Sequence, residues 1–255
     1  MTESFRSPFV VLALSLFVTW LSVWVGVLLR KRRKEIDPDV TRDLELILAS
    51  TLTLLGLIIG FSFSMAINRY DQRKNYEEAE ANAIGTEYVR ADLLSPSEAA
   101  RVRTLLREYL DQRILFYETR DEQNLQQINA RTATLQTELW SAVEVPAKAQ
   151  QTQVLALTLS GMNDVLNSQG YTQAAWWNRI PAGAWFLMAA VAICCSLLVG
   201  YTAHRAAEGY IRLMILPLIL SIAFFLISDI DGPRRGIIRV LPLNLISLSE
   251  SLQRP

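Results

Sequence analysis

Residues 46–67 read LILASTLTLLGLIIGFSFSMAI and contain no charged side chain. A helix needs about 20 apolar residues to cross the hydrocarbon of a bilayer, and this run is long enough. Residues 68–74, NRYDQRK, follow it without a turn signal. We therefore predict that the helix leaves the membrane and continues into water as one rigid element.

Three further runs are free of charge, at residues 8–29, 183–202 and 213–228. Together with residues 46–67 they predict four membrane spans, two toward each end of the chain. Hydrophobic residues make up 51% of the chain and charged residues 20%. This composition is typical of a membrane protein that also carries a polar domain.

The polar middle of the chain has no alternating strand pattern and few glycines, so we predict helices there. Residues 95–98, SPSE, form a capping box that starts one helix. Further helices are expected at 122–145, ended by Pro146, and at 147–168, before Gly170. The prediction is an all-α membrane protein of four transmembrane helices with a helical-bundle soluble domain inserted between spans two and three. The predicted parts are spans one and two in residues 1–67, the soluble helical domain in 68–181, spans three and four in 182–229, and a C-terminal tail in 230–255.

The chain shows no catalytic constellation. His204 is its only histidine, which excludes a histidine-based triad and a multi-histidine metal site within one chain. Glu77, Glu78 and Glu80 are interpreted as a hydrated helix face. The formal net charge is zero, which gives no reason to expect a nucleic-acid partner. We therefore predict that the protein is not an enzyme and holds no cofactor or metal.

Small residues recur every four positions in the second span, at Gly56, Gly60 and Ser64. Such a stripe lies along one face of a helix and lets another helix approach closely. We predict close helix packing on this face.

Thr53, Leu57 and Phe61 also recur every four positions and point in nearly one direction. If copies of this helix surround an axis, the three side chains form a narrow neck, and an apolar constriction can gate a pore by dewetting. Periodicity alone favours plain packing over a pore.

The run from Ile59 through Phe61 to residues 69–74, RYDQRK, resembles the second span of bestrophin anion channels. The segment containing Asp229, Asp231 and Pro233 is similar to the acidic segment and proline that follow the last span of that family. Residues 60–92 resemble the bacterial bestrophin-like family more closely than they resemble the bestrophin channels. This second resemblance extends over most of the chain.

The resemblance implies a ring of identical subunits, a pentamer as in bestrophins, with the lipid bilayer and small anions as its other partners. The positions implied as functional are the neck and the point where the second span leaves the membrane: Thr53, Leu57, Phe61, Asn68, Arg69 and Tyr70.

The chain departs from the bestrophin pattern in places. Thr53 is polar where a bulky apolar residue is expected, and Arg234 replaces an aromatic residue after the proline. Asp229 and Asp231 are expected to end the fourth span in water, with a subunit contact as the alternative. They supply too few oxygens to imply a calcium site, because calcium takes six or more.

The charge distribution leaves the orientation open. Bestrophins keep the helical domain in the cytoplasm, which places the basic residues 30–34 outside, whereas the positive-inside rule favours the opposite. Positive charges near the spans are nearly balanced between the two sides.

Two functions remain. The first is a homo-oligomeric, anion-selective ion channel of the cell (inner) membrane, with the second span lining the pore. The alternative is a membrane-embedded sensor or scaffold whose helical domain binds a ligand or partner. The apolar cores hold no charge, which argues against a proton-coupled transporter.

Overall fold

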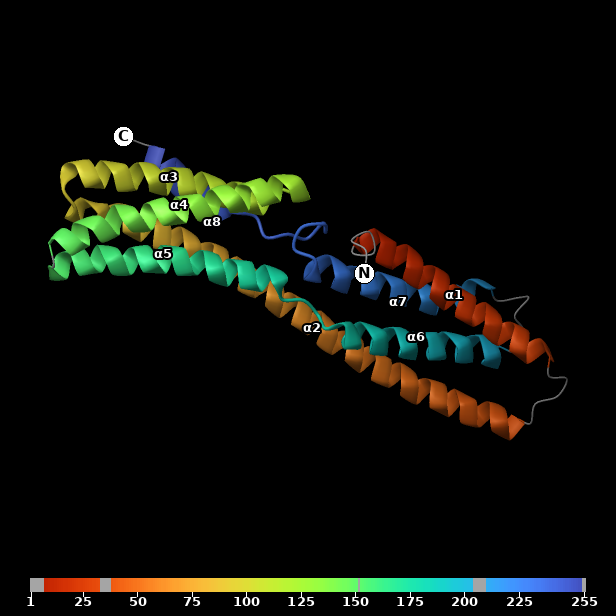
Figure 1. The fold of residues 1–255 in the computed structure, drawn as a ribbon. Helices are drawn as coiled ribbons and strands as arrows, with labels where there is room; N and C mark the ends of the chain where they lie inside the picture. Colours follow the sequence, from red (N-terminus) through yellow and green to blue (C-terminus); the bar gives the residue numbers. More distant parts are fainter. Residues whose placement is uncertain (1–6, 33–37, 151, 204–209, 254–255) are drawn as a thin grey trace. The chain divides into compact units, whose positions relative to one another are not determined.

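The computed structural model describes residues 7–32, 38–150, 152–203 and 210–253, and these contain helices and no strand. His204 and the last two residues of the basic run 30–34 lie outside the described residues. Four helical stretches are long and apolar enough to cross a membrane, which confirms the predicted all-α membrane fold. The elements are α1 (Pro8–Arg32), α2 (Pro38–Arg90), η2 (Ala91–Leu93), α3 (Pro96–Glu118), α4 (Glu122–Ala149), α5 (Gln153–Trp177), α6 (Ala182–Thr202), α7 (Tyr210–Asp231) and α8 (Leu243–Gln253) (Figure 1).

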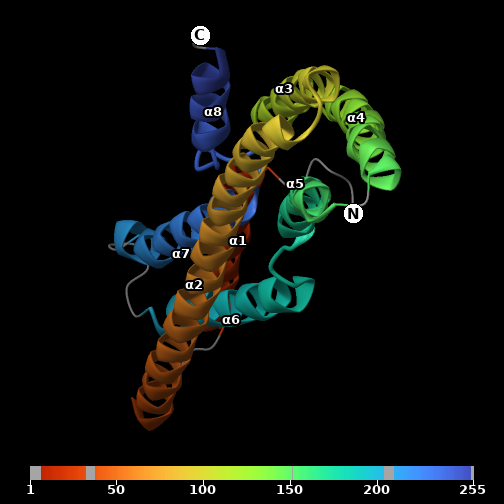
Figure 2. The ribbon, with the colours of Figure 1, turned by 90° about the vertical axis from the view of Figure 1, so that its left-hand side faces the viewer.

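The chain divides into two compact units, residues 1–69 with 179–239 and residues 70–178 with 240–255. Helix α2 contributes to both, since the division falls between Arg69 and Tyr70. Figure 2 shows α2 as one uninterrupted helix. Its bounds confirm that the helix of the second span continues well past Asn68.

In the first unit, α1 packs against α6 and α7. Helices α1 and α6 approach each other closely because a glycine of each helix faces the backbone of the other. A Cβ on Gly26 would lie 2.2 Å from the carbonyl oxygen of Leu197, and a Cβ on Gly200 would lie 2.0 Å from that of Val23. The sequence pattern did not predict this contact.

In the second unit, α3 packs against α4 and α4 against α5 (Figure 1). These helices share a continuous apolar core. Helix α3 starts where the capping box predicts, and the Ser95 N–H donates to Glu98 Oε2 at 3.1 Å. Helix α8 also packs against α3. Fully buried side chains of the core include Val102, Leu106, Leu135, Leu139, Met162 and Val165.

Two predicted helix ends and one predicted helix start were wrong, since residues 147–149 belong to α4 and α5 begins only at Gln153. Helix α4 continues through Pro146 to Ala149, because Pro146 is buried in the last turn and its carbonyl accepts the Gln150 N–H at 2.9 Å. Helix α5 continues through Gly170 to Trp177, because Trp176 is buried and packs against the core. Tertiary packing offsets the low helix propensity of both residues.

Candidate functional site

The predicted neck residues lie on the uncovered side of α2. Leu57 is 54% exposed, Phe61 is 63% exposed, and Thr53 is exposed as well. The Thr53 hydroxyl donates to the Ala49 carbonyl at 2.9 Å, so its polar group is satisfied within the helix. The buried positions of this stretch lie on the other side of the helix: Leu55, Ser62 and Ala66.

The small-residue stripe of α2 also lies open within the single chain. A Cβ built on Gly56 or Gly60 would meet nothing within 4 Å, and Ser64 is exposed. Any close packing on this stripe would have to come from another molecule. The predicted contact stays a prediction.

Arg69, where α2 leaves the apolar run, lies beside Asp231 at the end of α7. Its Nη1 is 3.6 Å from Asp231 Oδ1, and both side chains are mostly buried. Asp231 also accepts the Ile180 N–H, 3.2 Å from either carboxylate oxygen. The sequence singled out Arg69 and Asp231 separately, and the structure brings them together. Asn68 is exposed, whereas Tyr70 packs against the core of the second unit.

Asp229 organises the turn that follows α7. Its carboxylate accepts the N–H groups of Ile237 and Ile238, each at 2.8 Å. A Cβ on Gly236 would lie 2.6 Å from the Asp229 carbonyl oxygen, so the turn closes tightly on the helix end. Pro233 is buried in this turn.

The expectation that Asp229 and Asp231 end the fourth span in water was wrong. They are 1% and 5% exposed. Backbone N–H groups replace water around them, because a buried carboxylate needs hydrogen-bond donors. Within the described residues, no group of three or more potential ligands could hold a metal ion.

The interpretation of Glu77 and Glu80 as part of a hydrated helix face was also wrong, although Glu78 is exposed. Glu77 is 1% exposed and Glu80 is 0% exposed. Glu77, Glu80 and the buried Ile84 follow one another at intervals of three and four residues, which places them on one face of the helix. This spacing could have predicted that the two glutamates are buried. The charge of the two glutamates predicted exposure to water, whereas their spacing predicted burial in the core.

Glu80 and Arg113 form a fully buried ion pair between α2 and α3. Glu80 Oε2 also accepts the hydroxyl of Thr172 on α5 at 3.2 Å and that of Tyr117 on α3 at 3.4 Å. Burial, and then the Glu80 carboxylate, raise the pKa of Tyr117, so this phenol stays protonated as a donor. The network ties α2 to two helices of the second unit.

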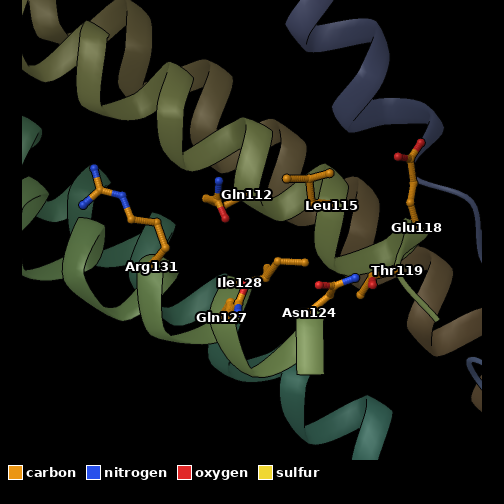
Figure 3. Close-up of a pocket in the computed structure, with 8 residues that line it drawn as sticks. All are labelled: Gln112, Leu115, Glu118, Thr119, Asn124, Gln127, Ile128 and Arg131. Atoms are coloured by element: carbon orange, nitrogen blue, oxygen red, sulfur yellow. The ribbon is translucent and has the colours of Figure 1, made fainter. Parts of the chain in front are cut away.

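An open hollow of about 560 Å³ lies between the end of α3 and the start of α4 (Figure 3). Arg131 at its edge is already engaged, since its Nε donates to Glu108 at 3.0 Å and its Nη1 lies 3.8 Å from Glu138. The hollow therefore offers no free charge from Arg131 to a ligand. Its lining comprises Gln112, Leu115, Glu118, Thr119, Asn124, Gln127, Ile128 and Arg131.

Comparison with known proteins identifies relatives of this architecture. A family model described as Bestrophin-like domain matches residues 10–245. The crystal structure of a bacterial bestrophin homologue from Klebsiella pneumoniae aligns with a TM-score of 0.61 over 95% of this chain and 96% of its own, at 12% identity. A mutant of a bacterial bestrophin homologue from the same organism aligns with a TM-score of 0.63 over 94% and 95%, also at 12% identity. No curated protein sequence matches significantly.

Proposed function

The chain belongs to the bestrophin-like family, and from this membership we propose that it is a subunit of a homo-oligomeric ion channel in the cell inner membrane. Characterised members of the family are ion channels. Four spans in one chain enclose no wide polar path, so conduction requires a ring of subunits. By resemblance to bestrophins the ring is a pentamer and the ions are small anions.

The observation that carries this proposal is the uncovered face of α2. Leu57 and Phe61 are large apolar side chains that the chain's own helices leave more than half exposed. The Gly56 and Gly60 positions beside them leave room for a neighbouring helix. A ring of subunits accounts for both features, since neighbouring copies would cover the small-residue stripe while the larger side chains face the axis.

The anion preference rests on the resemblance. The neck is apolar and carries no charge that would select an ion by attraction. Selection there would follow from the cost of dehydration at a constriction rather than from a charged ring. Arg69 lies where the helix leaves the apolar run, but Asp231 beside it offsets its charge.

Halide flux into liposomes tests the proposal. Purified wild type is compared with a Leu57→Ala, Phe61→Ala double variant and with empty vesicles. We expect selective flux from the wild type and a several-fold change in rate or selectivity in the double variant, because truncation widens the neck and makes it easier to hydrate. Phe186→Ala provides the matched control and should leave the flux unchanged, because Phe186 is a large side chain that is 77% exposed on α6 and lies outside the proposed pore-lining helix.

Absence of flux from a folded protein, at varied pH, calcium and voltage, would contradict the channel. It would favour the second candidate, a membrane sensor or scaffold. One observation supports that candidate, since α2 enters the core of the second unit and is fixed there through Glu77 and Glu80. A partner bound by the helical domain would then act through one continuous helix.

A further inference from the structure

Glu87 is a buried carboxyl that the contacts described above do not use. It lies in the last turn of α2 and is 0% exposed. Neither of its carboxyl oxygens has a hydrogen-bond partner within the described residues. A buried, unpartnered carboxylate is costly, whereas the neutral acid costs much less.

The carboxyl of Glu87 packs against Gly161 of α5. A Cβ on Gly161 would lie 2.0 Å from Glu87 Oε2 and 2.4 Å from Arg90 Nη1, so these two side chains together occupy the space that a side chain on Gly161 would fill. The Thr158 hydroxyl, one turn earlier on α5, is 1% exposed and has no hydrogen-bond partner within the described residues. This α2–α5 contact therefore contains polar groups that water does not reach.

Two charged groups act on Glu87 from the helices of this contact. Arg90, one turn further along α2, favours the ionised carboxylate, and Asp164 of α5 opposes it. Arg90 Nη1 is also directed to the Leu157 carbonyl of α5, at 3.5 Å. In η2, which packs against α5 as well, Asp92 is exposed and paired with Arg103 of α3.

Burial outweighs the effect of Arg90, and the pKa of Glu87 rises from its ordinary value of 4.5 to about 8. The carboxyl is therefore mostly protonated at neutral pH. A carboxyl whose pKa is higher in the folded than in the unfolded state stabilises the fold fully below about 4.5, and this contribution is lost as the pH rises to about 8.

We propose that Glu87 is a proton-binding site that controls the contact between α2 and α5. With the proton bound, the neutral side chain packs on Gly161. When the proton passes to hydroxide, or to water that enters as the contact opens, a buried carboxylate that accepts no hydrogen bond remains, and its desolvation cost, which Arg90 offsets only in part, loosens the contact. This proton-controlled contact lies in the helical domain and does not depend on whether the chain conducts ions.

Infrared difference spectroscopy of the full chain in detergent, titrated from acid to alkaline pH, tests this proton site. Wild type is compared with Glu87→Gln and with Glu78→Gln, a control on the exposed side of the same helix. We expect a carbonyl band of a protonated carboxylic acid that persists at neutral pH, disappears near pH 8 and is missing only in Glu87→Gln. A band that is absent at neutral pH in the wild type, or unchanged in Glu87→Gln, would overturn the proposal.

A second measurement tests the loosening of the contact. The melting temperature of Glu87→Gln, which mimics the neutral acid, should exceed that of the wild type by an amount that grows above about pH 5 and levels off above about pH 8. If Glu87→Gln fails to fold, Asp164→Asn replaces it as the test variant, because Asp164 is exposed. Removing this anion should shift the midpoint of the carboxyl band to lower pH. A melting difference that is independent of pH, or a midpoint that does not move, would contradict the switch.

Discussion

Glu77 of α2 caps the first turn of α8. Its Oε1 accepts the N–H groups of Asn244 at 2.9 Å and Leu245 at 3.0 Å, and its Oε2 accepts the Asn244 side-chain amide at 2.6 Å. The first N–H groups of a helix have no partner within it, and a carboxylate there also interacts favourably with the helix dipole. A residue distant in sequence thus provides the cap that α8 itself lacks.

Glu77→Ala should release the start of α8. Hydrogen bonds to a charged group contribute about 1.5–3 kcal/mol each, and the variant leaves several donors without an acceptor. We expect faster amide hydrogen exchange across residues 243–253 and a lower free energy of unfolding, whereas Glu78→Ala should leave both unchanged. Equal exchange in Glu77→Ala and the wild type would show that packing against α3 alone holds α8.

At the scale of the helices, the contact between α1 and α6 depends on two glycines. A side chain at Gly26 would meet the backbone of α6, which cannot move aside as a flexible side chain can. The second small-residue position, Gly200, accommodates the carbonyl of Val23 in the same way. Among the glycines that the structure describes, Gly26 and Gly200 therefore lie closest to the backbone of another helix.

Gly26→Ala should destabilise the protein by about 1–3 kcal/mol, which is the usual cost of overpacking a tight contact. Gly183→Ala provides the control, because Gly183 lies in α6 but a Cβ there would meet nothing within 4 Å. Thermal unfolding in detergent should show a lower melting temperature for Gly26→Ala and little change for Gly183→Ala. Similar melting temperatures of the two variants would mean that α1 and α6 accommodate the added methyl group without a loss of stability.

Sequence patterns predicted the helices better than their contacts. Charge-free runs and the capping box at Ser95 are local, and both predicted elements that the structure confirms. The burial of Glu80 could not be predicted from its own segment, because it depends on Arg113 across the contact. The pairing of Gly26 with α6 depends in the same way on which helices become neighbours.

At the scale of the whole molecule, α2 connects the proposed functional positions. It carries Thr53, Leu57 and Phe61 in the first unit and buried Glu77, Glu80 and Glu87 in the second. The sequence periodicity singled out the neck positions, and one chain leaves them exposed. Their role depends on further copies of the chain, which neither the sequence pattern nor a single subunit contains.

Cysteine cross-linking should show whether α2 faces other copies. In a background with Cys194→Ser and Cys195→Ser, Phe61→Cys should form disulfide-linked dimers in membranes, because a narrow neck brings neighbouring copies within the several ångströms that a disulfide spans. Leu55→Cys, at a position 1% exposed within the chain, should stay monomeric. Phe186→Cys on α6, at a position 77% exposed, controls for random collision between proteins in the membrane. Preferential linkage through Phe61→Cys supports a ring around α2, whereas equal linkage through Phe186→Cys, or none through Phe61→Cys even with a short bismaleimide, would place this face of α2 against lipid.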